Sequence, residues 1–250
     1  RLRDLRRVVT GGAPVSRDQV ARFKAVAPSA QVLILYGSTE VEPIAHIDGD
    51  ALLRGPVEQE GVNVGAFSPA LRWKFLRLQR GPIALGPKGW SEWEAPAGSP
   101  GELAVSGPHV CEQYYNNPAA FRETKIVDEN GSVWHRTGDV GLLDSQGDLW
   151  LVGRVHNAIA RGGHVLFPVQ AEIVLKRLSD VRQAAYVGLP DPSLGERAVA
   201  VVSLRTSALD PTACRRAVEE ALAACGLPVD NVRIVEEIPM DPRHHSKVEY

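Results

Sequence analysis

The segment that decides the fold is an apolar run ending in small polar residues, Gln31-Val32-Leu33-Ile34-Leu35-Tyr36-Gly37-Ser38-Thr39-Glu40. Its part from 31 to 36 has the length and composition of a buried strand. The glycine and hydroxyl residues after it predict a turn at the end of that strand. Upstream, Val8 and Val9 predict a shorter strand, which is followed by Gly11-Gly12-Ala13-Pro14.

A helix is predicted between these two strands. Ser16 and Gln19 have the spacing of a capping box, and Val20, Phe23 and Val26 follow at helical spacing. The chain therefore opens as strand, turn, helix and strand, which is typical of an α/β fold.

After about Gly61 the pattern changes to short apolar runs separated by glycine and proline. Such runs predict antiparallel strands, here at 71–78, 101–106, 140–143 and 149–152. The segment 83–100 is predicted to be a surface loop whose tryptophans, Trp90 and Trp93, are covered by other side chains. A short helix is predicted at 117–124.

A third pattern begins after Arg154 and predicts a small α+β unit. It contains a helix at 168–178 and strands at 184–189, 198–204 and 232–238. A last helix starts at Asp210-Pro211 and ends at Gly226, with an apolar stripe of Cys214, Val218, Leu222 and Cys225. Both cysteines of that stripe are predicted to pack in the core. The chain shows no internal repeats.

Composition limits the classes of function. The 250 residues are 44% hydrophobic and carry a formal net charge of -2, which allows one large or two modest cores and gives no reason to expect nucleic-acid binding. No apolar run approaches the ~20 residues of a membrane span, and no signal peptide opens the sequence. The three cysteines have no metal-ligand spacing, so a reducing, cytoplasmic setting is expected.

The first strand and turn offer groups suited to a nucleotide. Gly11 and Gly12 would let a flat ring lie against the backbone, because glycine has no Cβ, but taken alone they favour an ordinary turn. Tyr36 offers a ring that can stack on a purine, Thr39 a hydroxyl for a phosphate oxygen, and Glu40 a hard oxygen ligand for Mg²⁺. The alternative is a polar turn with a solvated Glu40.

Three later segments offer further groups, each with a plainer alternative. The carboxylate in Thr137-Gly138-Asp139 suits a ribose diol, or the segment is an Asx-turn. Gly162-Gly163 allow close approach of the backbone, or form an ordinary hairpin turn. Lys247 offers a compact cation for a carboxylate and a phosphate together, or belongs to a solvated basic tail.

Together these segments resemble the adenylate-forming enzymes, which include acyl-CoA synthetases, nonribosomal peptide adenylation domains and luciferases. The resemblance is carried by 35–40, His135-Arg136-Thr137-Gly138-Asp139, Gly153-Arg154 and Lys247. No single segment is specific, but four in the family's order and at plausible spacings are hard to obtain by chance. The resemblance implies a carboxylic acid as substrate, ATP and Mg²⁺ as cofactors and, in the ligases, coenzyme A.

The resemblance also implies roles for individual residues. The nucleotide contacts that it implies are Gly12, Ala13, Pro14, Tyr36, Gly37, Thr39, Asp139 and Arg154. The first three border the adenine, and Asp139 and Arg154 hold the ribose. Thr39, Glu40 and Lys247 are implied to be catalytic, with Glu40 as the Mg²⁺ ligand.

The resemblance also divides the chain into parts. Residues 1–153 would be the end of a large N-terminal domain, with an α/β piece at 1–60 and an antiparallel, β-barrel-like subdomain at 61–153. A hinge at 154–157 would lead to a small, mobile α+β domain at 158–250. His156 holds the hinge position, where Asp or Lys is commoner in the family, and a histidine there can titrate near neutral pH. Gly162 and Gly163 hold the position of a loop that forms part of the pantetheine tunnel in coenzyme A ligases.

One family feature is missing from this sequence. The family carries a loop rich in serine, threonine and glycine that ends in lysine and binds the phosphates, and no such loop is found here. The chain also starts at Arg1 without an initiator methionine. We therefore expect the C-terminal part of a longer protein, completed by a missing N-terminal half or a separate chain, and no adenylation by this chain alone.

Three functions remain open at this point. The first is an acyl-CoA ligase that activates a carboxylic acid, expected to be a fatty acid, as acyl-AMP and passes it to coenzyme A. The second is a β-lactone synthetase, in which a β-hydroxyl of the same substrate attacks the acyl-adenylate. Residues 135–154 and 241–247 are similar to olefin β-lactone synthetases. The third is a fragment that binds a nucleotide or a partner chain without catalysis.

Overall fold

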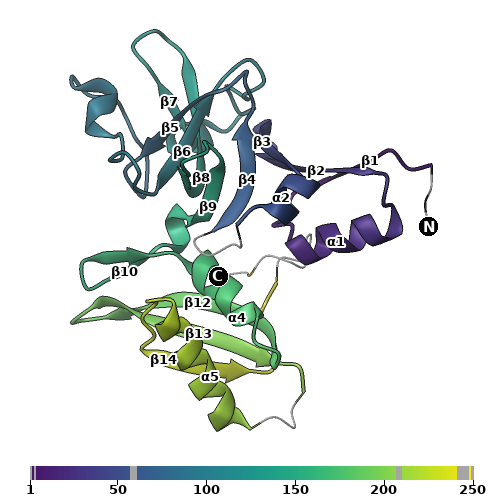
Figure 1. Cartoon of the computed structure of the whole chain (residues 1–250). Coiled ribbons are helices and arrows are strands. Elements are labelled where there is room, and N and C mark those ends of the chain that lie inside the picture. Colours follow the sequence, from purple (N-terminus) through teal and green to yellow (C-terminus); the bar gives the residue numbers. More distant parts are fainter. Residues whose placement is uncertain (1, 3, 57–60, 207–209, 241–247, 249–250) are drawn as a thin grey trace. The chain divides into compact units, whose positions relative to one another are not determined.

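A computed structural model describes residues 2, 4–56, 61–206, 210–240 and 248 (Figure 1). The chain separates into two compact units, one that reaches Leu151 and one that continues from Val152. Each unit has its own sheet and its own core, and each is described by itself.

The first unit is built mainly from strands. Its elements are β1 (Arg7–Gly11), α1 (Arg17–Val26), β2 (Gln31–Ser38), β3 (Val41–Asp48), α2 (Gly49–Arg54), β4 (Val62–Phe67), β5 (Arg72–Leu76), η1 (Gly89–Glu92), β6 (Gly101–Ser106), α3 (Pro118–Thr124), β7 (Lys125–Val127), β8 (Val133–Leu143) and β9 (Leu149–Arg154). The predicted opening of strand, helix and strand is confirmed by β1, α1 and β2.

Among the described residues, nine strands form one sheet in the order β1-β2-β3-β4-β9-β8-β6-β5, with β7 added to β8. β1 and β2 are parallel, whereas the other pairs of this sheet are antiparallel where their registers are known. The strand order runs from β1 to β5 without closing on itself. The subdomain predicted to be barrel-like at 61–153 therefore forms part of an open sheet in the described residues. The α/β piece and the β-rich part share one sheet because β3 pairs with β4.

The start of the chain folds around α1. Ser16 and Gln19 form the predicted capping box, with the side chain of each residue bonded to the backbone of the other. Val20 of α1 is fully buried and packs with Val32 and other residues of one core cluster. α1 lies against the sheet beside β1 and β2 (Figure 1).

The loop predicted at 83–100 contains the short helix η1. Trp90 and Trp93 pack against the buried cluster that includes Leu76 and Trp134, so the expectation that they are covered is confirmed. The ring centroids of Trp90 and Trp134 are 5.0 Å apart in an edge-to-face arrangement, which is favourable for aromatic pairs.

Two turns of the same design enclose β8. In the first, the Trp134 Nε1–H donates to Asp128 Oδ2 at 3.0 Å, while Asp128 Oδ1 accepts two backbone N–H groups of the turn. In the second, the Trp150 Nε1–H donates to Asp144 Oδ2 at 2.8 Å, and Asp144 Oδ1 likewise accepts two backbone N–H groups. Both bonds span six residues, so one local arrangement occurs at each end of β8.

The second unit is an α+β structure. Its elements are η2 (Val155–Asn157), β10 (Ile159–Arg161), β11 (His164–Leu166), α4 (Pro168–Lys176), β12 (Val181–Asp191), β13 (Gly195–Leu204), α5 (Pro211–Ala224) and β14 (Asn231–Val235). In the described residues the sheet has the order β11-β10-β13-β12, with β14 parallel to β13. The core joins this sheet to both helices, and Tyr186 is its largest fully buried side chain.

The prediction for the two cysteines of α5 is half right. Cys214 is buried in the core, but Cys225 is exposed. The helix ends at Ala224 and Cys225 is its C-cap, with φ -101 and ψ 9, so its side chain leaves the apolar stripe. No helix among the described residues is both long and apolar enough to cross a membrane.

Candidate functional site

The carboxyl ends of β1 and β2 lie side by side, and the predicted nucleotide contacts from Gly12 to Pro14 and from Tyr36 to Thr39 lie in or just after these ends. Gly11 pairs with Leu35 in the parallel register. A Cβ on Gly11 would lie 2.5 Å from the Leu35 carbonyl oxygen, so this position needs glycine. Gly12 and Pro14 are exposed, and Ala13 is half-buried. In open α/β sheets, ligands bind beyond the carboxyl ends of strands, as this edge would allow.

Tyr36 and Asp139 meet at this edge although 103 residues separate them in sequence. The Tyr36 hydroxyl donates to Asp139 Oδ2 at 2.7 Å. Tyr36 belongs to β2 and Asp139 to β8. The structure therefore brings together the residue predicted to stack on adenine and the residue predicted to hold ribose.

A bulge in β8 sets the position of Asp139. The pairing of β6 with β8 shifts between Glu102 and Ala104, and Gly138 has φ +72, which favours glycine. The Thr137 hydroxyl donates to the Leu103 carbonyl at 3.0 Å and accepts from the Asp139 N–H at 3.1 Å. Within this segment the structure shows a bond made by the Thr137 hydroxyl, inside a strand.

Glu40 follows the end of β2 and is half-buried, whereas Thr39 is exposed. The Tyr114 hydroxyl donates to Glu40 Oε1 at 3.0 Å. Burial raises the pKa of Glu40, but hydrogen bonds from its own backbone, from Ser38 and from Tyr114 outweigh this effect, and the net direction is downward. Glu40 is thus an anion at neutral pH.

The Glu40 carboxylate would suit a magnesium ion that is bound partly by the protein and partly by the phosphates of a nucleotide. Among the described residues, no group of three or more His, Cys, Asp or Glu could hold a metal. Mg²⁺ is commonly held by one or two carboxylates together with nucleotide phosphates and water. Glu40 would supply the carboxylate, with the phosphates of the nucleotide as further ligands.

His135 and Lys125 are buried directly behind this region and pair across β7 and β8. They are only 4% and 3% exposed. Burial, with the ammonium group of Lys125, lowers the pKa of His135 to about 4, although Glu40 opposes the shift. Nδ1 of His135 has no hydrogen-bond partner among the described residues. His135 is therefore neutral near pH 7 in the folded protein.

We expect the neutral His135 to make the free energy of unfolding depend on pH below neutrality. Its pKa rises from about 4 when folded to 6.5 when unfolded, so the unfolded state binds more protons between these pH values. The free energy of unfolding should therefore fall by up to about 3 kcal/mol as the pH falls through this window. Urea unfolding of the protein and of His135→Gln at several pH values measures the difference.

The matched control is His164→Gln, because His164 is an exposed histidine of β11. It should keep the acid dependence of the unsubstituted protein, whereas His135→Gln should reduce it. Equal slopes for the protein and His135→Gln would contradict the expected role of His135.

The other face of β8 holds a buried ion pair that the sequence reading did not identify. Arg136 donates through Nε and a terminal nitrogen to Glu102 Oε2, at 3.1 and 2.7 Å. Its guanidinium also donates to the carbonyl oxygens of Gly81, Glu123 and Gln79, at 2.6 to 3.1 Å. The side chains of the pair are 5% and 3% exposed. Arg136 thus ties the loop after β5 and the end of α3 to the strand that carries Asp139.

The second unit holds the remaining predicted site residues. Arg154 ends β9 and His156 lies in η2, and both side chains are exposed. Gly162-Gly163 form the turn between β10 and β11, with φ +56 and +81, so the hairpin alternative describes their local structure. Lys247 lies outside the described residues.

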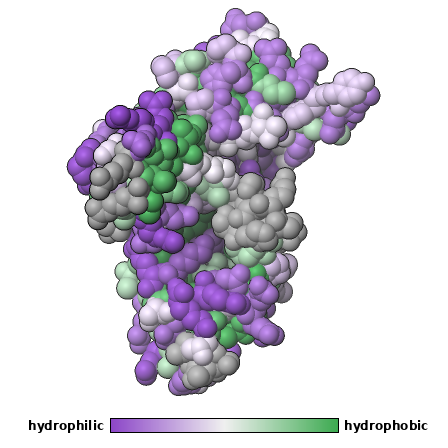
Figure 2. Space-filling model, turned by 90° about the vertical axis from the view of Figure 1, so that its right-hand side faces the viewer, coloured by the Kyte–Doolittle hydropathy of each residue, from purple (hydrophilic) through white to green (hydrophobic). Residues whose placement is uncertain are grey.

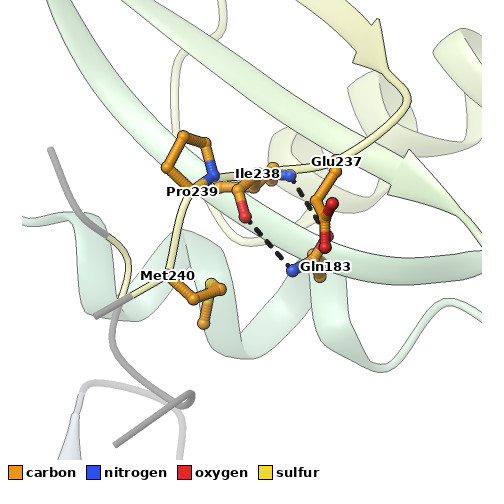
Figure 3. A pocket seen from close by; sticks show the side chains of 5 residues that line it. All are labelled: Gln183, Glu237, Ile238, Pro239 and Met240. Atoms are coloured by element: carbon orange, nitrogen blue, oxygen red, sulfur yellow. Dashed lines mark hydrogen bonds between the residues drawn. The ribbon is translucent and has the colours of Figure 1, made fainter. Parts of the chain in front are cut away.

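A hollow of about 490 Å³ in the second unit is lined by Gln183, Glu237, Ile238, Pro239 and Met240. It contains none of the predicted site residues. Gln183 donates to the Ile238 carbonyl at 3.3 Å and accepts from the Ile238 N–H at 3.2 Å (Figure 3). Gln183 also accepts from the buried hydroxyl of Ser203. These bonds fix the backbone of Ile238, a few residues before the segment that carries Lys247.

Comparison with protein families matches both parts of the chain. Residues 1–115 match the family described as "AMP-binding enzyme", and residues 170–244 match "AMP-binding enzyme C-terminal domain". The two matches fall in sequence order, as they would in a protein that carries both domains.

Individual relatives agree with this result. The chain is 32% identical to an olefin beta-lactone synthetase of Stenotrophomonas maltophilia over 97% of its own length and 45% of that protein. It is 30% identical to the acyl-CoA ligase sidI of Aspergillus fumigatus over 80% of its length and 32% of that protein. The chain thus spans less than half the length of each of these curated relatives.

A solved structure shows the same arrangement of elements. The amide bond synthetase McbA from Marinactinospora thermotolerans matches 98% of this chain and 45% of that chain, with a TM-score of 0.72 and 30% identity. The fold and the sequence therefore point to one family.

Proposed function

Because the chain belongs to the AMP-binding family of adenylate-forming enzymes, we propose that it takes part in activating a carboxylic acid with ATP. A carboxylate oxygen attacks the α-phosphorus, the bond to pyrophosphate breaks, and acyl-AMP forms. One observation carries the proposal: the hydrogen bond that joins Tyr36 to Asp139 at the carboxyl ends of the strands.

That bond supports a nucleoside site because it sets a ring beside a carboxylate. We propose that Tyr36 stacks on the adenine, with Gly12 and Pro14 at its edge, and that Asp139 accepts hydrogen bonds from the ribose hydroxyls. The exposed backbone at Gly12 has no atom within 4 Å of a built Cβ, which leaves space for a flat ring.

We propose that the phosphate chemistry depends on Thr39, Glu40 and Lys247. Thr39 would bind an α-phosphate oxygen through its exposed hydroxyl, and Glu40 would hold Mg²⁺ together with the nucleotide. Mg²⁺ supplies charge neutralisation on the phosphates during displacement. Lys247 would bind the acyl carboxylate and the α-phosphate together and would stabilise the charge that builds on the phosphate oxygens as the carboxylate attacks.

We propose that the acyl group then passes to coenzyme A, whose thiolate attacks the acyl carbonyl and displaces AMP. In this step the unit after the 154–157 segment would turn about His156, with Arg154 on the ribose. The hairpin at Gly162-Gly163 would line the approach of pantetheine. Both glycines are exposed and meet no atom within 4 Å of a built Cβ, which supports a close approach.

A β-lactone synthetase is the second candidate, and one observation favours it. The olefin beta-lactone synthetase of Stenotrophomonas maltophilia is matched over 97% of this chain, whereas the acyl-CoA ligase sidI is matched over 80%. A β-hydroxy fatty acid would then be the substrate, and its own hydroxyl would replace coenzyme A as the acceptor.

We also propose that a further segment of the fold, in this chain or in a separate one, pairs with the outer edge of β1. β1 ends the sheet of the described residues. Its Val9 is 55% exposed, and Val26 of the neighbouring α1 is 52% exposed. Figure 2 shows an apolar area on the face that carries these elements. An unpaired strand edge with exposed apolar side chains is a suitable place for another strand to add.

A cytoplasmic location is proposed because the cysteines are free thiols.

We expect this chain alone to release no pyrophosphate above background from ATP and a panel of fatty acids. The sequence lacks the loop whose backbone donors and lysine would hold the leaving pyrophosphate. Supplementing the chain with a segment that carries such a loop should restore release. Pyrophosphate and AMP are measured with and without coenzyme A.

Each result has a distinct meaning. AMP formation that requires coenzyme A supports the ligase, whereas AMP formation from a β-hydroxy acid without it supports the β-lactone synthetase. Turnover by the chain alone would show that the loop is not needed. The adenylation proposal is wrong if the supplemented protein releases no pyrophosphate with any acid.

A further inference from the structure

We propose that Tyr114 is a positioning residue for Glu40, which it orients toward the divalent cation of the nucleotide site. The inference rests on the proposed function, because it assumes that Glu40 holds that cation. It starts from the bond that the Tyr114 hydroxyl donates to Glu40 Oε1 at 3.0 Å, across 74 residues of sequence.

The segment that carries Tyr114 is bonded at two further points, one in the turn after β2 and one in β3. The Cys111 N–H donates to the Glu40 carbonyl oxygen at 2.7 Å. Nε2 of His109 lies 3.0 Å from the Pro43 carbonyl oxygen. Backbone and side chain of Glu40 are thus both held by residues 109–114, so the position of its carboxylate depends on this segment.

Tyr114 is itself held in place by the start of β7 and the end of α3. The Thr124 hydroxyl lies 3.2 Å from the Tyr114 hydroxyl oxygen. The Lys125 ammonium lies 5.1 Å from the centroid of the Tyr114 ring and donates to the Cys111 carbonyl. Since Lys125 is buried, this cation is fixed. The tyrosine ring is therefore a rigid support for the hydroxyl group.

The chemistry of the bond agrees with a supporting role. The Tyr114 hydroxyl is the donor of this bond, and the Glu40 carboxylate is its acceptor. A carboxylate that accepts such a bond loses rotational freedom before a metal arrives. Outer partners of metal-ligating carboxylates typically contribute about 10-fold to 100-fold to metal affinity.

The next residue provides a matched control. Tyr115 is 95% exposed. Tyr114→Phe and Tyr115→Phe each remove one hydroxyl and keep the ring. Mn²⁺ serves as the probe, and its free EPR signal is measured with saturating ATP in the loop-supplemented protein described above. We expect Tyr114→Phe to weaken Mn²⁺ binding about 10-fold or more and Tyr115→Phe to leave it unchanged.

A kinetic measurement separates positioning from catalysis. Tyr114→Phe should raise the metal concentration needed for half-maximal adenylation, while saturating metal should restore kcat. A fall in kcat that saturating metal does not correct would overturn the positioning role. So would a Tyr114→Phe protein that loses ATP affinity even in EDTA, since that result indicates a general structural defect.

Glu40→Gln distinguishes failure of this inference from failure of the proposed function. If Glu40→Gln weakens Mn²⁺ binding but Tyr114→Phe does not, the role of Tyr114 is overturned and the metal role of Glu40 stands. If Glu40→Gln leaves Mn²⁺ binding unchanged, the metal site itself is misassigned, and both statements fail.

Discussion

Replacing Lys247 with alanine is expected to slow acyl-adenylate formation by about a hundredfold or more, equivalent to roughly 3 kcal/mol of transition-state stabilisation, while transfer from supplied acyl-adenylate changes little. In the proposed function, Lys247 acts while the acyl carboxylate attacks the α-phosphate and negative charge builds on the phosphate oxygens. If the second unit turns between the two steps, Lys247 is distant from the reacting atoms during transfer. Both half-reactions are measured separately in the loop-supplemented protein.

Two variants serve as comparisons. Asp139→Ala should weaken both half-reactions, because the ribose is held throughout. Lys176→Ala removes another lysine of the second unit, one that is 47% exposed and lies 3.9 Å from Glu172, and should leave both unchanged. Equal slowing of the two steps by Lys247→Ala would contradict the two-state interpretation of the second unit.

Replacing Arg136 with methionine is expected to lower the free energy of unfolding of the first unit by about 3–5 kcal/mol. The substitution leaves the Glu102 carboxylate buried without its partner, and it removes the donors to three backbone carbonyls. Burial already raises the pKa of Glu102, an effect that Arg136 opposes. Urea unfolding followed by tryptophan fluorescence measures the change.

The control is Arg122→Met, because Arg122 is an exposed arginine of α3 and should change stability by less than about 0.5 kcal/mol. The double variant Arg136→Met with Glu102→Leu tests the cause. It should recover part of the loss, since it buries no unpaired charge. A loss below about 1 kcal/mol for Arg136→Met alone would mean that the buried pair contributes little to stability.

The elements that local sequence determines were predicted well. The capping box before α1, the proline and aspartate at the start of α5, and the apolar run of β2 all act within a few residues. β8 was predicted only from 140, although it starts at Val133. Its first half contains His135 and Arg136, whose burial depends on partners far away in sequence, so periodicity cannot reveal it.

The candidate site likewise contains residues that the sequence identified and residues that it missed. Residues 36–40 and Asp139 were identified through resemblance to a family, and the structure adds that Tyr36 and Asp139 are hydrogen-bonded. Tyr114 and the partners of Arg136 were missed, because a cross-sheet contact leaves no local pattern. In the sequence, Arg136 is marked only by its neighbours Trp134 and His135 and by the apolar run that starts at Val140.

The paired turns around β8 have a consequence for mispairing. Moving β8 by one residue against its neighbours would exchange the faces of His135 and Arg136, which are both buried, and would separate the guanidinium of Arg136 from the carboxylate of Glu102. The bond from Trp134 to Asp128 opposes this movement at one end of the strand, and the bond from Trp150 to Asp144 opposes it at the other. Each bond lies within a short hairpin, so each can form without long-range contacts. We expect the two turns to disfavour alternative pairings of β8 and so to keep Asp139 within reach of Tyr36.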